Sequence, residues 1–461
     1  MTIHKRREIA RTESLCPECL GRVKAQVVST CDTVYLEKTC ADHGSWQVPL
    51  WRGLPAYEQW QRPKSPSRPE LCYAPVQDGC PFDCGLCEEH RQNPCSVLLE
   101  ITQRCTLGCP VCFADVEGAG RTDQDPDMVT IGGWYDRVMA AAGACNIQLS
   151  GGEPTQRDDL PEIIAMGREK GFSFIQLNSN GLRLAAEPDY ARTLAKAGLT
   201  TVFLQFDGTT DPIHTVLRGR PLAAEKATAV ERCGEAGLGV VLVPTLVPGV
   251  NTADIGNIIR YALANLTVVR GIHFQPISYF GRYSLGKPDF ERITLPEVMR
   301  SIEEQTTGLI RASDFIPPGG ENAHCSFHGS FFVQPDGRLR RIGSAQTGCC
   351  SSQDGREGLL RTIGSVARQW SAPLSDSTAT DSLSADDAVM SLDAFLERAT
   401  SHSLSISCMA FQDAWNLDLE RLRECCISVM SPEGQLIPFC AYNLTSATGK
   451  SLYRHQEEQP A

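Results

Sequence analysis

The spacing of the cysteines constrains this chain more than any other feature. The sequence has 461 residues and 21 cysteines, and 12 of the cysteines lie between Cys16 and Cys112. Secreted scaffolds rich in disulfides are short and carry a signal peptide. The start of this chain, Met1–Leu15, is basic and polar with no apolar segment, so we expect no signal peptide and a cytoplasmic protein. In such a protein, clustered thiols indicate metal ligands or catalytic groups.

Charge and hydropathy exclude two classes of protein. The net charge is −12 and only 7% of the residues are aromatic, so a broad basic face for nucleic acid is not expected. The longest mostly apolar run, Ala236–Val250, contains two prolines. It is shorter than the roughly 20 apolar residues that a membrane-spanning helix needs. We therefore expect neither a nucleic-acid partner nor a transmembrane segment.

Residues 1–61 have the pattern of a small metal module. Two tight turns, Cys16-Pro-Glu-Cys19 and Cys40-Ala-Asp-His43, flank a short predicted strand. Two such turns at the ends of a hairpin bring four soft ligands into a tetrahedron, which suits zinc or a rubredoxin-like iron. The predicted ligands are Cys16, Cys19, Cys40 and His43, with Cys31 as the alternative to His43.

A second cysteine cluster occupies residues 70–95, after a proline-rich linker. Cys80, Cys84 and Cys87 have x3 and x2 spacing, and Cys95 follows eight positions later. Four thiols at this spacing predict one [4Fe–4S] cluster, with a structural zinc site as the alternative.

Residues 96–312 alternate between short apolar runs and amphipathic stretches of helical length. This pattern predicts an α/β fold, namely an open partial barrel of six βα units. The predicted strands are Val97–Ile101, Asn146–Leu149, Ser173–Leu177, Thr201–Phe206, Gly239–Val243 and Gly271–Gln275. The predicted helices include Thr130–Ala142, Leu160–Lys170, Pro188–Ala197, Ala223–Ala236 and Ala253–Leu263.

The remaining residues, 313–461, form a further region. Within it, Ser351 to about Ser403 is rich in Ser, Asp, Thr and Ala and is predicted to have little structure. Cys145 and Cys233 lie in apolar surroundings and are expected in the core. His324 and His328 are expected at the surface, with a role as acid or base near a substrate as the alternative.

A third motif, Cys105-x3-Cys109-x2-Cys112, directly follows the first predicted barrel strand. Three cysteines cannot supply all four ligands of a [4Fe–4S] cluster, so one iron stays open to a small molecule. A fourth cysteine from elsewhere would make the same site a plain electron carrier.

The motif and its context resemble the radical SAM superfamily, whose cluster binds S-adenosylmethionine (SAM) at the open iron. Gly151-Gly152-Glu153 resembles the superfamily's GGE motif, which implies backbone contact with SAM and an acid that receives its ammonium. Further implied contacts come from Asn178 and Asn180, and from Asp207 to the ribose. All these segments end consecutive predicted strands, the face where such barrels place active sites. The superfamily usually has an aromatic residue at the position of Val111; here the aromatic residue is Phe113 instead, which implies that backbone near Val111 holds the adenine.

A closer resemblance covers nearly the whole chain. The motifs follow one another in the same order as in the subgroup of tetraether lipid synthase and archaeal pterin methylase-like proteins, which this chain resembles. The C-terminal sequence is similar to that of TrsS-type radical SAM (seleno)proteins. In this subgroup the C-terminal region holds a further [4Fe–4S] cluster, and Cys408, Cys425 and Cys440 occupy the matching positions. The candidates for the fourth ligand of this cluster are Cys426, Cys325 and the pair Cys349-Cys350.

The resemblance implies a radical SAM enzyme. Reductive cleavage of SAM would yield a 5′-deoxyadenosyl radical that takes hydrogen from an unactivated carbon of a small molecule or lipid, ending in methylation or a new C–C bond. An electron donor such as flavodoxin or ferredoxin is implied, and a methyltransferase partner is a candidate. The alternatives are a multi-cluster electron carrier and a zinc-ribbon scaffold without SAM chemistry.

Overall fold

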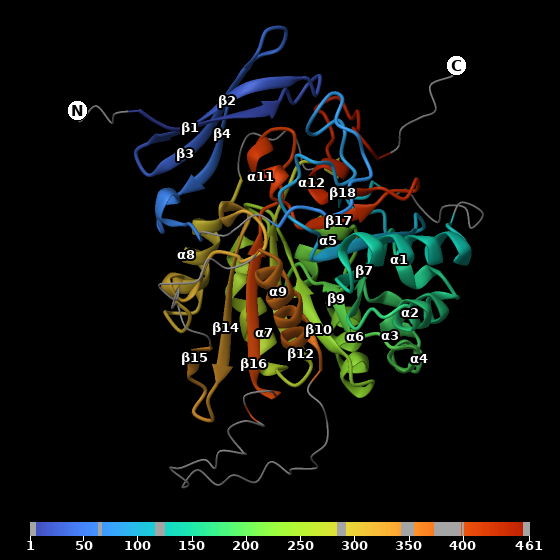
Figure 1. Cartoon of the computed structure of the whole chain (residues 1–461). Helices are drawn as coiled ribbons and strands as arrows, with labels where there is room; N and C mark the ends of the chain where they lie inside the picture. The colour runs from blue at the N-terminus through green and yellow to red at the C-terminus, as the bar shows by residue number, and fades with distance from the viewer. Residues whose placement is uncertain are drawn as a thin grey trace.

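The computed structural model describes residues 6–62, 67–115, 125–283, 292–342, 355–372, 398 and 401–454. Within these ranges the chain forms a four-stranded N-terminal ribbon and a twelve-stranded sheet. The ribbon and several short C-terminal elements lie together at one end of the large sheet, and helices cover its outer face (Figure 1). None of the helices in the described ranges has the length and apolar character needed to cross a bilayer.

The ribbon is an antiparallel meander in which each strand pairs with the next. Its strands are β1 (Arg7–Leu15), β2 (Arg22–Thr30), β3 (Thr33–Cys40) and β4 (Gly44–Arg52). In a meander, the turns after the first and third strands meet at one end of the sheet, and the turn after the second lies at the other. Cys16, Cys19, Cys40 and His43 therefore share one end, whereas Cys31 lies in the turn at the opposite end.

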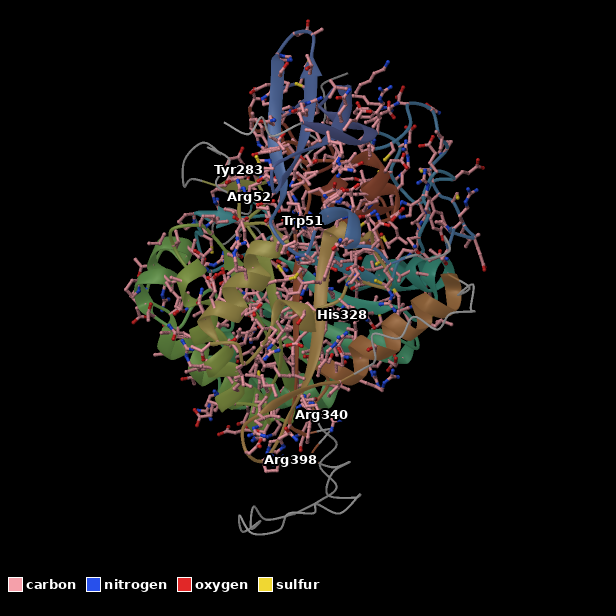
Figure 2. The ribbon with its side chains drawn as sticks, turned by 90° about the vertical axis from the view of Figure 1, so that its left-hand side faces the viewer. Trp51, Arg52, Tyr283, His328, Arg340 and Arg398 are labelled. Carbon is pink, nitrogen blue, oxygen red and sulfur yellow. The ribbon has the colours of Figure 1, made fainter. Side chains whose placement is uncertain are left out.

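Aromatic side chains attach the ribbon to the rest of the molecule. Tyr57 stacks on His324 with ring centroids 3.7 Å apart, and Trp51 meets both rings edge-on. The indole N–H of Trp60 donates to the carbonyl of Ala323 at 3.0 Å. Figure 2 shows Trp51 and Arg52 at this junction. His324 is partly buried here, so the expectation of a surface position was wrong.

Six parallel strands form the centre of the large sheet in sequence order, as predicted. They are β5 (Ser96–Thr102), β7 (Asn146–Gly151), β8 (Ile175–Ser179), β9 (Thr201–Gln205), β10 (Gly239–Val243) and β12 (Val269–Pro276). The predicted helices correspond to α1 (Met128–Ala142), α2 (Leu160–Glu169), α4 (Tyr190–Ala197), α6 (Ala223–Glu235) and α7 (Ile255–Ala264). Within the described part of residues 96–312, three helices were not among those named in the prediction, α3 (Leu182–Ala186), α5 (Asp211–Arg218) and α8 (Leu295–Gln305).

The C-terminal region extends this sheet at both edges. Beside β12 lie β16 (Ser403–Met409), β14 (Ser326–Val333) and β15 (Leu339–Ile342); beside β5 lie β17 (Ile427–Met430) and β18 (Leu436–Pro438). Open edges of a sheet carry unpaired backbone groups, and these added strands pair them. The short helices α11 (Leu419–Arg423) and α12 (Phe439–Tyr442) lie near β17 and β18 (Figure 1).

One helix contradicts the prediction of little structure between Ser351 and Ser403. Helix α9 (Gly355–Trp370) contacts β10, β12 and β16. Two glycines make room for it: a Cβ atom at Gly239 would lie 2.3 Å from the carbonyl oxygen of Trp370, and one at Gly271 would lie 3.3 Å from its indole nitrogen. Most of the remaining stretch, and Cys349 and Cys350, lie outside the described residues.

Side chains of the barrel strands alternate between an apolar outer face and a polar inner face. Ile147, Leu149, Ile175 and Leu177 belong to the main hydrophobic core. The alternate positions line an internal cavity and include six carboxamides, Asn146, Gln148, Gln176, Asn178, Gln205 and Gln275. The interiors of closed barrels are usually filled by branched apolar side chains. This barrel instead encloses a cavity in which these carboxamides stand beside apolar side chains.

Candidate active site

The loop after β5 places three cysteines at the wall of the internal cavity, which has a volume of about 560 Å³. Cys109 is buried, and Cys105 and Cys112 are partly buried. Burial raises the pKa of the Cys105 thiol to about 11 and also raises that of Cys109. Such thiols become good ligands when a metal centre stabilises their thiolates. Three converging thiols with no described fourth cysteine in this loop fit a [4Fe–4S] cluster with one open iron.

Two glycines bring the loop after β7 against the cysteine loop. A Cβ atom at Gly151 would lie 2.1 Å from the carbonyl oxygen of Thr102, and one at Gly152 would lie 2.2 Å from that of Arg104. Gly151 also has a φ of +121°, a conformation that favours glycine. The N–H groups of Gly152 and Glu153 donate to the same two carbonyls at 2.8 and 2.7 Å. Only glycine allows this close approach, and both glycines line the cavity.

Glu153 presents a buried carboxylate at the same end of the cavity. It accepts hydrogen bonds from the hydroxyl of Ser179 at 2.8 Å, the N–H of Asn180 at 2.6 Å and the hydroxyl of Thr155 at 2.7 Å. Burial raises its pKa above the usual value, although these hydrogen bonds act in the opposite direction. A buried carboxylate of this kind gains most from a cationic ligand, such as an ammonium group.

Asn178 and Asn180 both line the cavity but make different contacts. The Asn178 side chain bonds to two neighbours on the inner face, Gln148 and Gln176. The Asn180 amide donates to Thr106 in the cysteine loop at 3.3 Å, and its oxygen accepts from the N–H of Leu182. Asn180 therefore links the third strand to the cysteine loop.

Asp207, which is predicted to contact the ribose, forms a buried ion pair. Its carboxylate is fully buried, is not part of the cavity wall, and forms two hydrogen bonds to the Arg218 guanidinium at 2.6 and 2.7 Å. Burial alone would raise the pKa of Asp207, but Arg218 and Lys226 outweigh burial and hold it below its usual value. Through these bonds Asp207 positions Arg218, which lines the cavity; the contact of Asp207 with the ribose stays a prediction.

Arg218 is a cavity residue that the sequence reasoning missed. Its guanidinium also donates to the carbonyl of Val111 at 2.9 Å, between two of the cluster cysteines. Val111 and Phe113 both line the cavity. The nearby Lys226 is fully buried and donates to the carbonyl of Asn180 at 2.6 Å; burial lowers its pKa to about 8. One indication of these contacts was present in the sequence: the basic residues Arg218 and Lys226 both follow the strand that precedes Asp207.

The N-terminal turns bring Cys16, Cys19, Cys40 and His43 together, with their ligand atoms all within 4.8 Å of one another. A hydrogen bond from His43 lowers the pKa of Cys40 to about 7, whereas burial raises that of Cys16 to about 11. The donor set and its spacing fit a tetrahedral zinc or iron ion. Cys31 does not belong to this group.

Of the second cysteine cluster, three members lie together and one is set apart. Cys80, Cys84 and Cys87 are buried, and the neighbouring thiols and burial raise the pKa of Cys84. The sulfur of Cys95 instead lies 2.9 Å from that of Cys426. The reason is that Cys95 and Cys426 directly precede the paired strands β5 and β17.

Two of the three predicted C-terminal ligands lie near each other, and the third lies on a barrel strand. Cys425 and Cys440 are near each other and near Cys325, and the N–H of Gln412 donates to the Cys440 sulfur at 3.2 Å. The Arg421 guanidinium donates to the Cys325 sulfur at 3.3 Å. Cys408 is buried at the end of β16 and lines the cavity.

The barrel region and the strand β14 hold the remaining cysteines and the second histidine of the predictions. Cys145 and Cys233 lie in the core, as expected. His328, expected at the surface, lies on β14 and lines the cavity (Figure 2). Because side chains alternate along β14, the side chain of His328 points inward. This direction could not be predicted from the sequence, because the sequence did not show that β14 joins the barrel sheet.

Family models and related proteins match large parts of this chain. The family model for the radical SAM superfamily matches residues 99–262, and the HMPTM N-terminal zinc ribbon domain matches residues 8–52. The 7,8-dihydro-6-hydroxymethylpterin dimethyltransferase of Methanocaldococcus jannaschii is 33% identical to this chain, over 97% of the chain and 95% of that protein. A probable GTP 3′,8-cyclase of Methanopyrus kandleri is 29% identical, over 48% of the chain and 67% of that protein.

Among solved structures, Streptococcus suis SuiB bound to the precursor peptide SuiA is similar with a TM-score of 0.40 and 16% identity, over 47% of this chain and 46% of that chain. The match to the methanogen protein spans nearly the full length of both chains, and the family model covers the barrel with its cysteine motif. This chain is a radical SAM enzyme with an N-terminal zinc ribbon, and it belongs to the radical SAM superfamily, in the family of the pterin dimethyltransferase of Methanocaldococcus jannaschii.

Proposed function

We propose that this enzyme methylates an unactivated carbon of its substrate, or joins it to another carbon, inside the barrel. Cys105, Cys109 and Cys112 would hold the [4Fe–4S] cluster, and Glu153 would receive the ammonium of SAM. When bound and reduced, the cluster and SAM supply a 5′-deoxyadenosyl radical that takes a hydrogen atom from the substrate. The relative's name supports methylation as the outcome.

One observation carries this proposal. The three thiols, the glycine pair and Glu153 all line one cavity, and so do inner-face residues of the barrel strands. This arrangement would place SAM and a substrate in a single enclosure. The chain's own residues hold both reactants close together and exclude water, which would otherwise consume a reactive intermediate.

Within the SAM site, each remaining residue has a proposed role. Gly151 and Gly152 let the backbone approach the cofactor, and Asn180 ties this loop to the cysteine loop. Val111 and Phe113 would contact the adenine. Asn178 lies farther along the inner face. Asp207, through Arg218, would fix a positive charge at the cavity wall.

We further propose two auxiliary [4Fe–4S] clusters and one zinc or iron ion in the ribbon. Cys80, Cys84 and Cys87 would hold the first cluster, and Cys95 stays its proposed fourth ligand although its sulfur lies beside Cys426. Cys408, Cys425 and Cys440 would hold the second. Cys325 is the favoured fourth ligand, because it lies near both Cys425 and Cys440. The domain boundaries 1–61, 70–95, 96–312 and 313–461 follow these sites.

Partners and location belong to the same proposal. Reductive SAM cleavage needs an electron donor, for which flavodoxin or ferredoxin is suited, and a methyltransferase partner is a candidate. Fe–S ligation by many thiols is expected where thiols stay reduced, which favours the cytoplasm. The substrate is a small molecule or a lipid.

Replacing Glu153 with Gln tests the SAM site. Loss of a charged hydrogen bond typically costs roughly 1.5–3 kcal/mol, so SAM should bind about ten- to a hundredfold more weakly while the iron content stays unchanged. Calorimetric titration of the reconstituted protein with SAM measures the effect, and Glu169→Gln, at an exposed position on α2, serves as the control. Normal SAM affinity in Glu153→Gln would show that this carboxylate does not meet the ammonium.

A further inference from the structure

A groove of about 770 Å³ lies outside the barrel, where the N-terminal ribbon meets helix α8. Tyr35 on β3 and Arg52 at the end of β4 line it from the ribbon, and α8 and the segment Pro248–Ala253 line it from the barrel. Arg52 marks this junction in Figure 2. Of the described residues, none lines both this groove and the barrel cavity, so the junction groove is a separate feature of the molecule.

The charge of the junction groove is opposite to that of the whole chain. Three arginines, Arg52, Arg292 and Arg300, line the groove, and Glu297 is the one carboxylate among its described lining residues. The chain as a whole has a net charge of −12. Cations gathered in a concave surface create a local positive potential that attracts anions.

The Glu297 carboxylate already has partners within the protein. It accepts hydrogen bonds from the N–H and the hydroxyl of Thr294 at 2.8 and 2.7 Å, which caps the start of α8. It also pairs with the Arg52 guanidinium at 3.3 Å. Glu297 therefore neutralises part of the charge of Arg52 and leaves that of Arg300 uncompensated.

Several donors in the groove lack a partner. The Arg300 guanidinium, on the exposed side of α8, forms no ion pair or hydrogen bond with any described residue. The hydroxyls of Tyr35, Thr252 and Ser301 likewise make no hydrogen bond within the described ranges. Guanidinium groups only donate, and each hydroxyl can donate once. A ligand rich in acceptor oxygens would match this set.

Arg292 gives an independent indication. Its side chain is only 5% exposed and lines the groove, and one terminal nitrogen donates to Asp413 at 2.8 Å. The guanidinium lies over the ring of Tyr279 at 4.6 Å, so it is held in place. Its Nε has no hydrogen-bond partner in the described part of the chain. A buried charged donor without a partner costs free energy, and an anion oxygen at this nitrogen would remove that cost.

We propose that the junction groove binds a multiply charged oxyanion, such as a phosphate or polycarboxylate group. Arg300 and Arg292 supply the charge, because guanidinium groups match the paired oxygens of both kinds of anion. The hydroxyl of Tyr35 donates from the ribbon, and those of Thr252 and Ser301 donate from the barrel side. The bound anion thus bridges the ribbon and the barrel. This site goes beyond the proposed function and is independent of SAM chemistry.

Titration with defined anions tests the inference. The reconstituted full-length enzyme is titrated by calorimetry with inorganic phosphate, with tricarballylate and with uncharged glucose, and its metal content is measured before and after. At least one of the two anions should bind, more weakly as the salt concentration rises, and glucose should not. The anion that binds more tightly identifies the source of the oxyanion group. Binding of neither anion in the millimolar range would overturn the proposal.

Variants then locate the binding. Arg300→Gln should weaken anion binding about ten- to a hundredfold, because it removes a hydrogen bond from a charged donor. Arg300 is exposed and has no described partner, so this variant should fold normally. Arg340→Gln is the matched control and should bind as the wild type does, because Arg340 is exposed on β15, far from Arg52 (Figure 2). Unchanged affinity in Arg300→Gln would overturn the proposal.

Thermal unfolding of the same proteins provides a second measurement. A ligand that binds only the folded state raises the unfolding temperature in proportion to its binding free energy. The anion that binds should therefore raise the unfolding temperature of the wild type and of Arg340→Gln, and raise that of Arg300→Gln less. An equal rise in all three proteins would show that the anion binds somewhere other than the junction groove.

Discussion

The Cys109→Ala enzyme should form no 5′-deoxyadenosine. With only Cys105 and Cys112 left in the loop, two irons of the cluster would lack a protein ligand and the cluster should not assemble. The expected loss is complete, in contrast to the graded loss for Glu153→Gln. The measurement is chromatographic quantification of 5′-deoxyadenosine after reaction with SAM and dithionite.

A second cysteine variant controls for the loss of a thiol as such. Cys233→Ala removes a buried core thiol on α6. This variant should lose some stability through the small cavity it leaves but should still form 5′-deoxyadenosine. If Cys109→Ala retained the activity, the motif after β5 would not hold the SAM cluster.

The Cys440→Ala enzyme should lose about four irons and keep SAM cleavage. The reason is spatial, since Cys440 lies on α12, near Cys425 and Cys325, and not in the loop of Cys109. We expect 5′-deoxyadenosine without methylated or coupled product, because the auxiliary cluster would serve the later step in which an electron is returned. Iron analysis and 5′-deoxyadenosine yield are measured together.

Cys31→Ala is the control for this variant, because Cys31 is exposed in the ribbon turn away from the metal ligands. Its metal content should equal that of the wild type. An unchanged iron content in a folded Cys440→Ala protein would show that Cys440 does not hold a C-terminal cluster.

Local patterns in the sequence were enough to predict the barrel. The strands around Ile147 and Val241 are short apolar runs between amphipathic helices, and the inserted motifs follow directly at their ends. For Gly151 and Gly152 the resemblance implied backbone contact with SAM; it did not predict that these glycines pack against the carbonyls of Thr102 and Arg104.

Long-range pairing explains what could not be predicted. β14, β16 and β17 join the barrel sheet through partners far away in the sequence, such as Phe274 with Cys408, and no local pattern reveals such pairs. The inward position of His328 and the contact between Cys95 and Cys426 follow from that pairing. The ion pair between Asp207 and Arg218 was not predicted, because Arg218 lies on helix α5, which was not predicted either.

The carboxamides on the inner face show another limit of prediction from the sequence. The alternation of apolar and polar residues in β7 and β8 was visible in the sequence and predicted strands. It did not reveal that both faces are covered, with the polar face turned into a chamber instead of toward solvent. Helix α9, which contacts β10, β12 and β16, and several loops complete the wall of this cavity.

The most direct test of the account is the reaction of the anaerobically reconstituted full-length enzyme with SAM and a strong reductant. Iron and 5′-deoxyadenosine are quantified in the same sample. The account predicts 5′-deoxyadenosine that requires both the reductant and the iron. An enzyme loaded with iron that binds SAM but yields no 5′-deoxyadenosine under these conditions would contradict it.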